Sequence, residues 1–466
     1  MKRKCITVQE YKKIVLSPGD KEGDNDNKKL FDELCQFVDD FTGAKNVEDD
    51  VSLFIKKGKD KQGTFVQITN YVGLIQLPNG HQIDILPKIY FTNSVENNSY
   101  DITNKYSYVD VNQKESDDIK ITKKIFVDMF CTLKNIKKAK VLRNGDLEVK
   151  NKPIFEIYIS MFLSSLNELI KKGLRSIYLN KLENVSFFKG KLMINQHIKH
   201  NIVHKEKFYT QFDEFSYNRV ENRLLKSTLV KLLKISKDAK NIQNIKEDLV
   251  FFDLVDTSIN YKNDFKKVMI DKSTKEYDEL LKWAEVFLDN KSFITFSGSH
   301  GAKALLYKMN DLFESYVAKR IRNVFGDTYE IKTQSTSKKL FDNPQKFTLR
   351  PDIVLRDKFN NTIIMDTKWK KLINDERKNY GISQMDMYQM FAYSIRHACG
   401  NANKLPKVYL LYPSNSLERV NKNYLSSTKC GDVNIETFMI NFTDEKPYID
   451  NSLKELKEKI SKSKNE

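Results

Sequence analysis

The spacing of apolar residues along the chain changes from a strand-like pattern to a helix-like pattern and then to a mixture of both. Residues 51–90 contain short runs with apolar alternation, such as GTFVQITNYVGLIQL, which predict β-strands. Residues 28–41 have apolar positions three and four apart, as in an amphipathic helix. The Asn-Gly pair at 79–80 favours a tight hairpin between strands. The chain is therefore predicted to begin with a small α+β domain.

Helical spacing dominates the middle of the chain. Helices are predicted at 121–136, 153–173, 218–236 and 275–290. Gly173 follows two lysines, as a C-terminal helix cap does. Residues 92–120 lack apolar periodicity and are rich in Asn, Ser and Asp, which predicts a long surface excursion.

A third pattern begins near residue 291, where a helix, several strands, a second helix and a further strand are expected. We therefore predict three regions, with boundaries at 1–150, 151–290 and 291–466. The predicted fold is an α+β amino-terminal region with a β-rich domain, a mixed helical middle section and a carboxy-terminal α/β domain.

Composition limits the class of protein. The chain is 40% hydrophobic and carries 79 Lys and Arg against 62 Asp and Glu, a net charge of +17. This excess favours a polyanionic partner such as nucleic acid, although scattered lysines are equally typical of a solvated surface. Five cysteines without a CxxC pair argue against structural zinc, and no run approaches the roughly 20 apolar residues of a membrane span. We expect a cytoplasmic protein.

Two aspartates stand out in the segment TLRPDIVLRDKFNNTIIMDTKWKKL, residues 348–372. If 357–361 is the loop of a hairpin, Asp352 and Asp366 are symmetric about residue 359 and their side chains lie side by side on one face. Lys368, two residues further on, points to the same face.

Paired buried carboxylates repel one another unless a cation lies between them. Mg²⁺ prefers carboxylate oxygens, lowers the pKa of a bound water and offsets phosphate charge, while Lys368 could orient the water or stabilise negative charge. The pattern thus predicts a phosphodiesterase centre. The alternative is a structural pair neutralised by Arg350, Lys368 and Lys370.

A Pro-Asp pair, a 13-residue gap, an apolar triplet and Asp-Thr-Lys together resemble the PD-(D/E)xK nuclease superfamily. Glu314 lies at the border of the apolar stripe of a helix predicted over 304–325, where it could reach the metal or its water shell. The resemblance implies that the catalytic residues are Asp352, Asp366 and Lys368. It also implies that the metal is bound by Asp352, Asp366, Thr367 and Glu314.

A second helix, capped by Ser383, carries Gln389 and Tyr393 four residues apart on one face. This Q-x-x-x-Y pattern after D-x-K resembles the RecB-like branch of the superfamily. By this resemblance Gln389 and Tyr393, together with Arg350, would contact DNA or support the site. Plain helix packing is the alternative interpretation.

Four blocks, at 71–89, 187–208, 212–226 and 311–393, resemble McrC, the nuclease subunit of McrBC-type modification-dependent restriction systems. No G-x-x-x-x-G-K-[ST] motif is present, so nucleotide hydrolysis is expected in a separate protein. The resemblance implies an AAA+ GTPase partner, McrB, that docks on the region before residue 290 and is stimulated by this chain. Arg219 and Arg223 are candidate partner contacts, and cutting both DNA strands suggests self-pairing of nuclease domains.

Three further interpretations remain open. His197, His200 and His204 have a spacing that could place them on one helix face as a metal site, although surface or phosphate-binding histidines are the alternative. The chain could instead be a RecB-like nuclease that acts alone or with a helicase. It could also be a non-catalytic DNA-binding assembly subunit.

Overall fold

The computed structural model of the chain describes most of its residues and divides into two compact units. Unit 1 contains Met1–Lys138, Gly145–Asn151 and Gly298–Glu466, and unit 2 contains Ala139–Asn144 and Lys152–Ser297. The described residues are 5–16, 25–43, 55–61, 63–77, 81–88, 99–101, 117–132, 152–269, 276–289, 303–398, 405–414, 420–429, 431–443 and 448–462. None of the helices in these ranges combines the length and the apolar character that a membrane span requires.

Unit 1 contains a four-stranded sheet, sheet A, that joins distant parts of the sequence. Its strand order is β1 (Cys5–Gln9), β6 (Gln82–Leu86), β5 (Tyr71–Gln76) and β11 (Lys303–Lys308). β1 is parallel to β6, whereas β5 is antiparallel to both β6 and β11. The pairing of Gln76 with Gln82 confirms the predicted hairpin, whose Asn-Gly turn lies outside the described residues.

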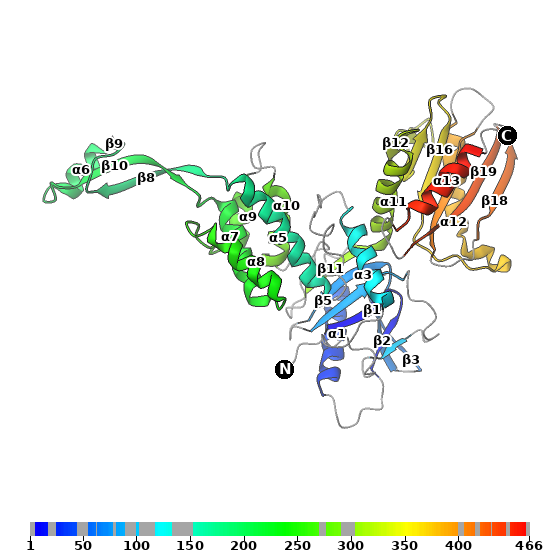
Figure 1. Ribbon diagram of the computed structural model, residues 1–466, viewed down its shortest axis with the longest axis horizontal. Helices are drawn as coiled ribbons and strands as arrows, with labels where there is room; N and C mark the ends of the chain where they lie inside the picture. Colours follow the sequence, from blue (N-terminus) through cyan, green and yellow to red (C-terminus); the bar gives the residue numbers. More distant parts are fainter. Residues whose placement is uncertain are drawn as a thin grey trace. The chain divides into compact units, whose positions relative to one another are not determined.

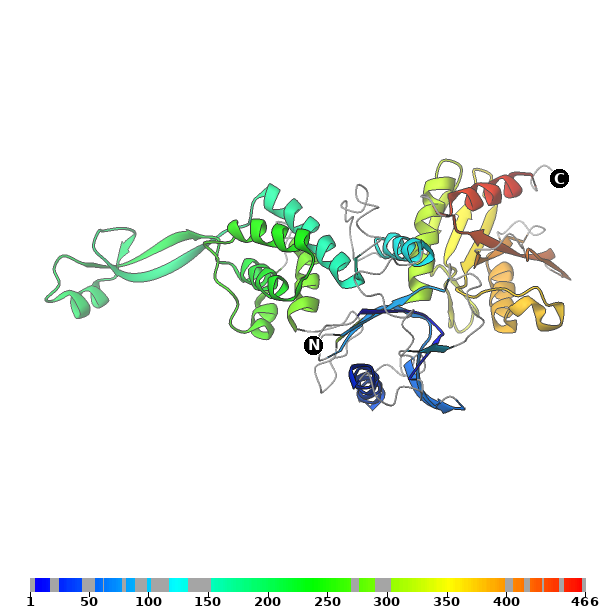
Figure 2. The same cartoon turned by 60° about the horizontal axis from the view of Figure 1, so that its bottom comes forward.

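A second sheet of unit 1, sheet B, has the order β3 (Ile55–Asp60), β4 (Gly63–Ile68), β2 (Lys13–Val15) and β7 (Ser99–Asp101). Helix α1 (Asn25–Gly43) packs on β3 and β4, and Figure 2 shows it inside the curve of these strands. Its buried side chains are at helical spacing: Leu30, Leu34, Phe37 and Val38. The helix predicted at 28–41 is confirmed.

The predicted surface excursion at 92–120 is only partly correct. Residues 99–101 form β7, which pairs with β2, and Asp117 begins helix α3 (Asp117–Phe130). A strand of three residues is too short to show the apolar alternation by which strands are recognised in a sequence. The rest of this segment lies outside the described residues.

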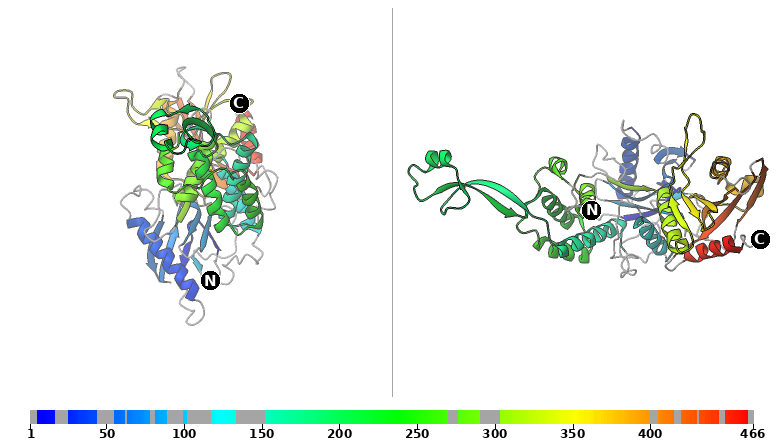
Figure 3. Two further views of the ribbon diagram at one scale, coloured as in Figure 1. Left: turned by 90° about the vertical axis from the view of Figure 1, so that its left-hand side faces the viewer. Right: turned by 90° about the horizontal axis from the view of Figure 1, so that it is seen from above.

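A six-stranded sheet, sheet D, forms the carboxy-terminal part of unit 1. Its order is β12 (Glu330–Thr333), β15 (Ile353–Arg356), β16 (Thr362–Thr367), β17 (Lys407–Ser414), β19 (Gly431–Asn441) and β18 (Asn423–Thr428). Helices α11 (Met309–Phe325) and α13 (Asp450–Lys462) contact each other on one face, and α12 (Gln384–Arg396) packs on the other (Figure 3). β16 is buried along its whole length, as its Ile-Ile-Met run predicts.

The helix predicted over 304–325 is wrong in its first turn and a half. Residues 303–308 form β11, and α11 begins at Met309, so the first five positions of the predicted helix belong to a strand. A short apolar run next to a helix is compatible with either structure, and here pairing with β5 decides it. Two further short elements are the ribbon β13 (Lys338–Lys339) with β14 (Thr348–Leu349) and the 3-10 helix η3 (Glu376–Gly381).

Unit 2 is a cluster of helices that carries a long β-arm. The helices are α5 (Ile154–Lys172), α7 (Val220–Ile235), α8 (Ala239–Val250), α9 (Tyr261–Lys267) and α10 (Tyr277–Asp289). Trp283 and Phe287 of α10 pack against Tyr158 and Phe162 of α5. This core confirms the helices predicted at 153–173, 218–236 and 275–290.

The arm comprises residues 177–216. Its antiparallel strands β8 (Ile177–Val185) and β10 (Phe208–Ser216) run away from the helices of unit 2 (Figure 1). β9 (Lys191–Leu192) and α6 (Ile194–Asn201) lie at its far end (Figure 1). Exposed apolar side chains follow the whole arm: Ile177, Tyr178, Leu182, Phe187, Phe188, Ile194, Ile198, Ile202, Val203 and Phe215.

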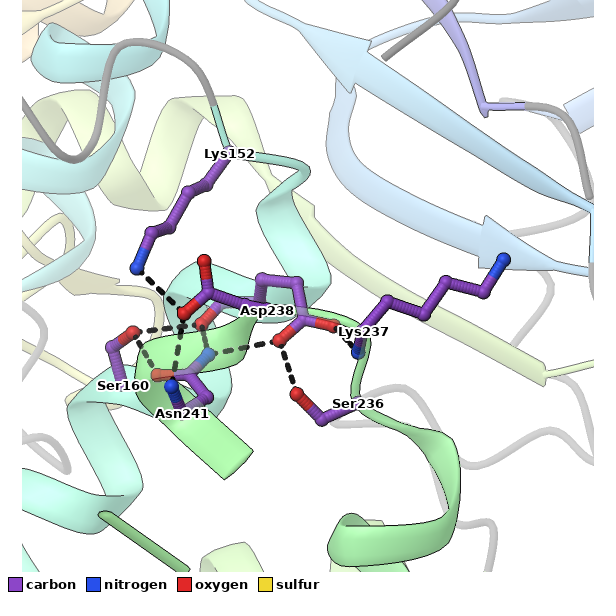
Figure 4. Close-up of polar contacts among 7 residues, drawn as sticks. Lys152, Ser160, Ser236, Lys237, Asp238 and Asn241 are labelled. Carbon is purple, nitrogen blue, oxygen red and sulfur yellow. Dashed lines mark hydrogen bonds and ion pairs between the residues drawn. The ribbon is translucent and has the colours of Figure 1, made fainter. Parts of the chain in front are cut away.

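A buried polar network joins α5 to the start of α8 in unit 2 (Figure 4). The Glu156 carboxylate accepts hydrogen bonds from Ser236 Oγ, the Lys237 amide and Asn241 Nδ2, each at 2.8 Å. Asp238 caps α8 by accepting from the Asn241 amide at 2.9 Å. Because both oxygens of Glu156 are satisfied, the network stabilises the α7–α8 connection.

The chain divides into two compact units, whereas three regions are predicted from the sequence. Unit 2 corresponds closely to the predicted middle region, and unit 1 combines the predicted first and third regions. The assignment of a separate role to each of the three regions stays a prediction.

Candidate functional site

The predicted hairpin around residue 359 is confirmed by the strand register. β15 pairs with β16 through Ile353 with Met365 and Val354 with Ile364. Continuing that register by one position places Asp352 opposite Asp366. The loop is held by Asp357, which accepts hydrogen bonds from the Phe359 and Asn361 amides at 2.9 and 2.8 Å.

Both aspartates occupy an environment that disfavours charge. Asp366 is 1% exposed, and burial together with the nearby Asp352 raises its pKa to about 7. Burial also raises the pKa of Asp352, against the hydrogen bonds that its Oδ2 accepts from the Thr367 amide and hydroxyl at 2.7 Å each. The pair is thus an acidic site in which a bound cation would relieve two charge penalties.

Lys368 lies against this pair. Its Nζ is 2.6 Å from Asp366 Oδ2 and donates to Gln389 Oε1 at 3.2 Å. Burial alone would lower the pKa of Lys368, but the Asp366 carboxylate raises it above its ordinary value. The ammonium group therefore stays charged at neutral pH.

The predicted Gln389 and Tyr393 pair faces the same centre from α12. Gln389 Nε2 donates to the Tyr393 hydroxyl at 2.7 Å, which orients the amide oxygen toward Lys368. Tyr393 is buried against the sheet, whereas Gln389 is exposed. Burial and the nearby Asp366 raise the pKa of Tyr393, so its hydroxyl stays neutral.

Glu314 and Arg350 meet at a residue that sequence reasoning missed. Gln334 Nε2 donates to Glu314 Oε1 at 2.6 Å, and Arg350 NH2 donates to Gln334 Oε1. Burial, with Asp352 as the second cause, raises the pKa of Glu314 to about 7. Gln334 has a φ of 49°, unusual for a residue other than glycine. No local sequence signal distinguishes it, because its role depends on three separate segments.

Glu10 and Lys88 of sheet A also reach this region and were missed. Trp369, which follows Lys368, donates through Nε1 to Glu10 Oε1 at 2.6 Å, and Lys88 Nζ donates to the Trp369 carbonyl at 3.4 Å. Burial raises the pKa of Glu10 to about 7. These contacts span most of the sequence, so no spacing rule could have indicated them.

The oxygen donors of the acidic pair suit a hard divalent cation. Within the part of the chain that the structure describes, no group of three or more His, Cys, Asp or Glu residues is arranged to hold a metal. Two carboxylates with raised pKa values remain, and Mg²⁺ is usually bound through one or two carboxylates with waters and substrate oxygens. The Asp352 and Asp366 pair fits that mode, and direct ligation by Glu314 or Thr367 stays a prediction.

The candidate partner and histidine residues lie in unit 2. Arg219 pairs with Glu221 at 3.1 Å and Arg223 with Asp264 at 3.4 Å, so both guanidinium groups are engaged within the unit. The structure does not place the three histidines on one helix face, since α6 (Ile194–Asn201) ends before His204. Asn201, the last residue of α6, donates through Nδ2 to the Lys207 carbonyl at 3.1 Å, and among the described residues none of these histidines belongs to a metal-holding group.

Comparisons with known proteins identify the family and the fold of the chain. A family model described as McrBC 5-methylcytosine restriction system component matches residues 66–413. No match is found among curated proteins. The chain is similar in structure to a chain in a refined half-complex, which comes from a tetradecameric assembly of Thermococcus gammatolerans McrB AAA+ hexamers with bound McrC. That match has 16% identity and a TM-score of 0.68, and covers 98% of this chain and 100% of the other.

A second structure, the cryo-EM structure of the Thermococcus gammatolerans McrBC complex, contains a chain with 16% identity and a TM-score of 0.45. That match covers 67% of this chain and 85% of the other. The first structural match shows a shared mixed α/β fold. The family model spans most of the chain. As its resemblance to McrC predicted, the chain belongs to the family of McrBC 5-methylcytosine restriction system components.

Proposed function

We propose that the chain is the DNA-cleaving subunit of a McrBC-like restriction system and that it hydrolyses phosphodiester bonds with Mg²⁺ at Asp352 and Asp366. The observation that carries this proposal is the register of the β15–β16 hairpin, which sets the two acids opposite each other with Lys368 on Asp366. The arrangement supports a PD-(D/E)xK type of nuclease domain built on sheet D.

Each residue of the centre has a distinct role in this proposal. Asp352 and Asp366 would hold Mg²⁺, which would supply Lewis-acid polarisation of the phosphate and a water of lowered pKa. Thr367 keeps Asp352 in place through its two hydrogen bonds. Lys368, charged at neutral pH, stabilises the negative charge that develops on the phosphate, and Gln389 holds the ammonium group toward it.

The catalytic assignment predicts loss of cleavage without loss of fold. Asp366→Asn or Lys368→Met should lower the rate of DNA cleavage by about a hundredfold or more, because each removes charge that the transition state requires. Cleavage of 5-methylcytosine-containing duplex DNA would be measured with Mg²⁺, GTP and the partner AAA+ protein. Matched controls are the exposed Asp432→Asn and Lys371→Met, which lie outside the centre.

Unchanged cleavage in both variants would contradict the nuclease assignment. Thermal unfolding in Mg²⁺ adds a readout that does not depend on activity. The ion should raise the melting temperature of the parent chain more than that of Asp366→Asn. Robust cleavage by the parent chain without partner or nucleotide would favour a RecB-like nuclease that acts alone.

We further propose that unit 2 binds the AAA+ GTPase partner through its arm and stimulates that partner. The structure with a TM-score of 0.68 contains McrC bound to McrB hexamers, and the arm of this chain carries exposed apolar side chains suited to a protein interface. Phe187 and Phe188, 65% and 59% exposed, are suitable targets. Changing both to Ser should abolish stimulation of GTP hydrolysis, whereas a partner still fully stimulated would contradict this role.

The guanidinium groups of Arg219 and Arg223 already form ion pairs within unit 2, which is evidence against direct contacts with the partner. Their role in partner binding stays a prediction. Self-pairing of the nuclease domains is proposed on chemical grounds, since a double-strand break requires a cut in each strand.

A further inference from the structure

A short basic ribbon leaves the candidate centre and returns to it. We define the basic ribbon as residues 335–349, which contain the β13–β14 pair. At one end Gln334 bonds to Glu314 and, through its amide, to the Asp352 carbonyl at 2.9 Å. At the other end Arg350 donates to Gln334. Both ends of the ribbon are therefore held at Gln334, which bonds to the backbone of Asp352 and to Glu314.

Two phenylalanines lie exposed on this ribbon. Phe341 is 53% exposed and Phe347 is 69% exposed, with ring centroids 5.9 Å apart in an edge-to-face arrangement. The backbone amide of Leu340 donates to the Phe347 carbonyl at 2.9 Å. Residues 340–347 therefore form a loop whose two ends are joined by a hydrogen bond. Two large apolar rings that lie more than half exposed are poorly explained by folding of the chain itself.

The backbone at Phe347 adds a second unusual feature. Its φ is 58°, in the left-handed region that bulky side chains rarely occupy because this conformation costs free energy. Burial does not offset this cost, because residues 341–348 are all exposed. Strained backbone of this kind is concentrated at functional sites.

The charge around the two rings is positive. The ribbon contains Lys338, Lys339 and Lys346 against a single acid, Asp342, and Arg350 directly follows it. Asp342 is neutralised by Arg396, whose NH1 donates to it at 3.0 Å. Arg396 also donates through Nε to the Lys339 carbonyl at 2.8 Å, which fixes the ribbon to α12, the helix that carries Gln389.

We propose that the basic ribbon binds the DNA substrate beside the scissile bond, with its lysines on backbone phosphates and with Phe341 and Phe347 against the bases. Positive charge together with exposed aromatic rings is the chemistry that recognises nucleic acid: cations release condensed counterions, and rings stack on bases or insert between them. The proposal rests on the proposed nuclease function, because it places the contact next to the cut.

The separation between Phe347 and Asp352 along the chain sets how far from the cleaved phosphate the rings can contact DNA. Phe347 lies five residues before Asp352, a reach of roughly 17 Å in an extended strand, or about five base pairs of duplex. We therefore expect the rings to act within about five base pairs of the cleaved phosphate.

Two sets of substitutions test this contact in the full chain. The first is the double variant Phe341→Ala with Phe347→Ala, and its control is Phe359→Ala, an 87% exposed ring in the β15–β16 loop. The second changes Lys338, Lys339 and Lys346 to Gln, and its control changes three exposed lysines of α11 and α13 to Gln: Lys319, Lys454 and Lys462. Every target is surface-exposed or half-buried, so the variants should fold, as circular dichroism would verify.

Binding is measured by fluorescence anisotropy of a labelled duplex in chains that also carry Asp366→Asn, which prevents cutting. The aromatic double variant should weaken binding by about tenfold or more, and the lysine variant should reduce the slope of log K against log salt by about three. With Asp366 intact, both variants should cleave more slowly and still stimulate the partner GTPase.

Binding and cleavage equal to those of the controls would overturn the ribbon proposal and leave the assignment of Asp366 intact. A parent chain that binds no duplex at low salt would also overturn it. Cleavage that survives Asp366→Asn would instead refute the nuclease function, whatever the ribbon variants do.

Discussion

The carboxyl group of Asp366 is held in surroundings that disfavour its charged form. It is almost fully buried beside Asp352, and Lys368 only partly offsets the loss of water around it. In an unfolded chain the same carboxyl group titrates near its ordinary pKa of about 3.9. The folded protein therefore retains a proton that the unfolded chain releases between about pH 4 and pH 7.

This difference predicts a pH-dependent stability of the metal-free protein. Since the folded state binds the extra proton, the free energy of unfolding should fall as pH rises from 4 to 7, by on the order of 1.4 kcal/mol per unit of pKa difference. Below pH 4 the penalty is absent. Asp366→Asn should flatten this decline, as measured by chemical denaturation at several pH values.

The comparison with the variant matters because burial also raises the pKa values of Glu10 and Glu314 to about 7. Only the difference between parent and variant isolates Asp366. If the two curves run parallel from pH 4 to 8, the carboxyl group is not perturbed as described.

A second residue-scale prediction concerns Glu156 in unit 2. Glu156→Gln replaces an acceptor of three hydrogen bonds with a side chain whose amide would face the donors, so it should destabilise unit 2 by about 1 to 3 kcal/mol. Thermal or chemical unfolding would measure the change. The control is Glu168→Gln on the exposed face of the same helix, which should change stability by less than about 0.5 kcal/mol.

At the scale of elements, strand β11 depends on one glycine of its neighbour. Gly73 in β5 has a φ of 135°, and a Cβ there would lie 2.0 Å from the Leu305 carbonyl oxygen of β11. Only glycine allows the two backbones to approach so closely. β11 leads directly into α11, so this pairing also anchors the helix that carries Glu314.

Gly73→Ala should therefore cost more than backbone strain alone. We expect a loss of several kcal/mol and weaker pairing of β11, detectable by hydrogen exchange of the β5 and β11 amides. Gly63→Ala is the matched control, because Gly63 has a φ of 114° but nothing within 4 Å of its Cβ position. Equal destabilisation by the two changes would show that the close approach is unimportant.

Sequence reasoning succeeded where structure is local and failed where it is not. The hairpin register of Asp352 and Asp366 follows from turn residues and symmetry within 15 positions, and the amphipathic helices follow from their own periodicity. By contrast, the local pattern predicts helix for the residues of β11, because the strand that pairs with it lies more than 200 residues away. Gln334, Glu10 and Lys88 have no local signature, since only the folded chain brings them to the site.

At the scale of the molecule, unit 2 is built almost entirely from one continuous segment. Its aromatic core is formed within that segment by α5 and α10, and Trp283 stacks on Phe287. Lys231 Nζ also donates to the Leu288 carbonyl at 2.9 Å, which ties α7 to the end of α10.

A fragment covering residues 152–289 should therefore fold alone with helical circular dichroism, a blue-shifted Trp283 emission and a cooperative unfolding transition. The control fragment 152–268 lacks α10 and should not fold cooperatively, because the rings that fill the core are missing. A fully unfolded longer fragment would show that unit 2 needs unit 1 for its stability.

The composition of sheet A also has a consequence for protein synthesis. Gln76 at the end of β5 and Lys303 at the start of β11 are 227 positions apart (303 minus 76). At ribosomal speeds of about 5 to 20 residues per second, the nascent chain exposes the unpaired edge of β5 for roughly 10 to 45 s. An open edge is a template for aggregation. Ribosome stalling within the codons for unit 2 should thus increase insoluble product, and chaperones that shield nascent strands should reduce it.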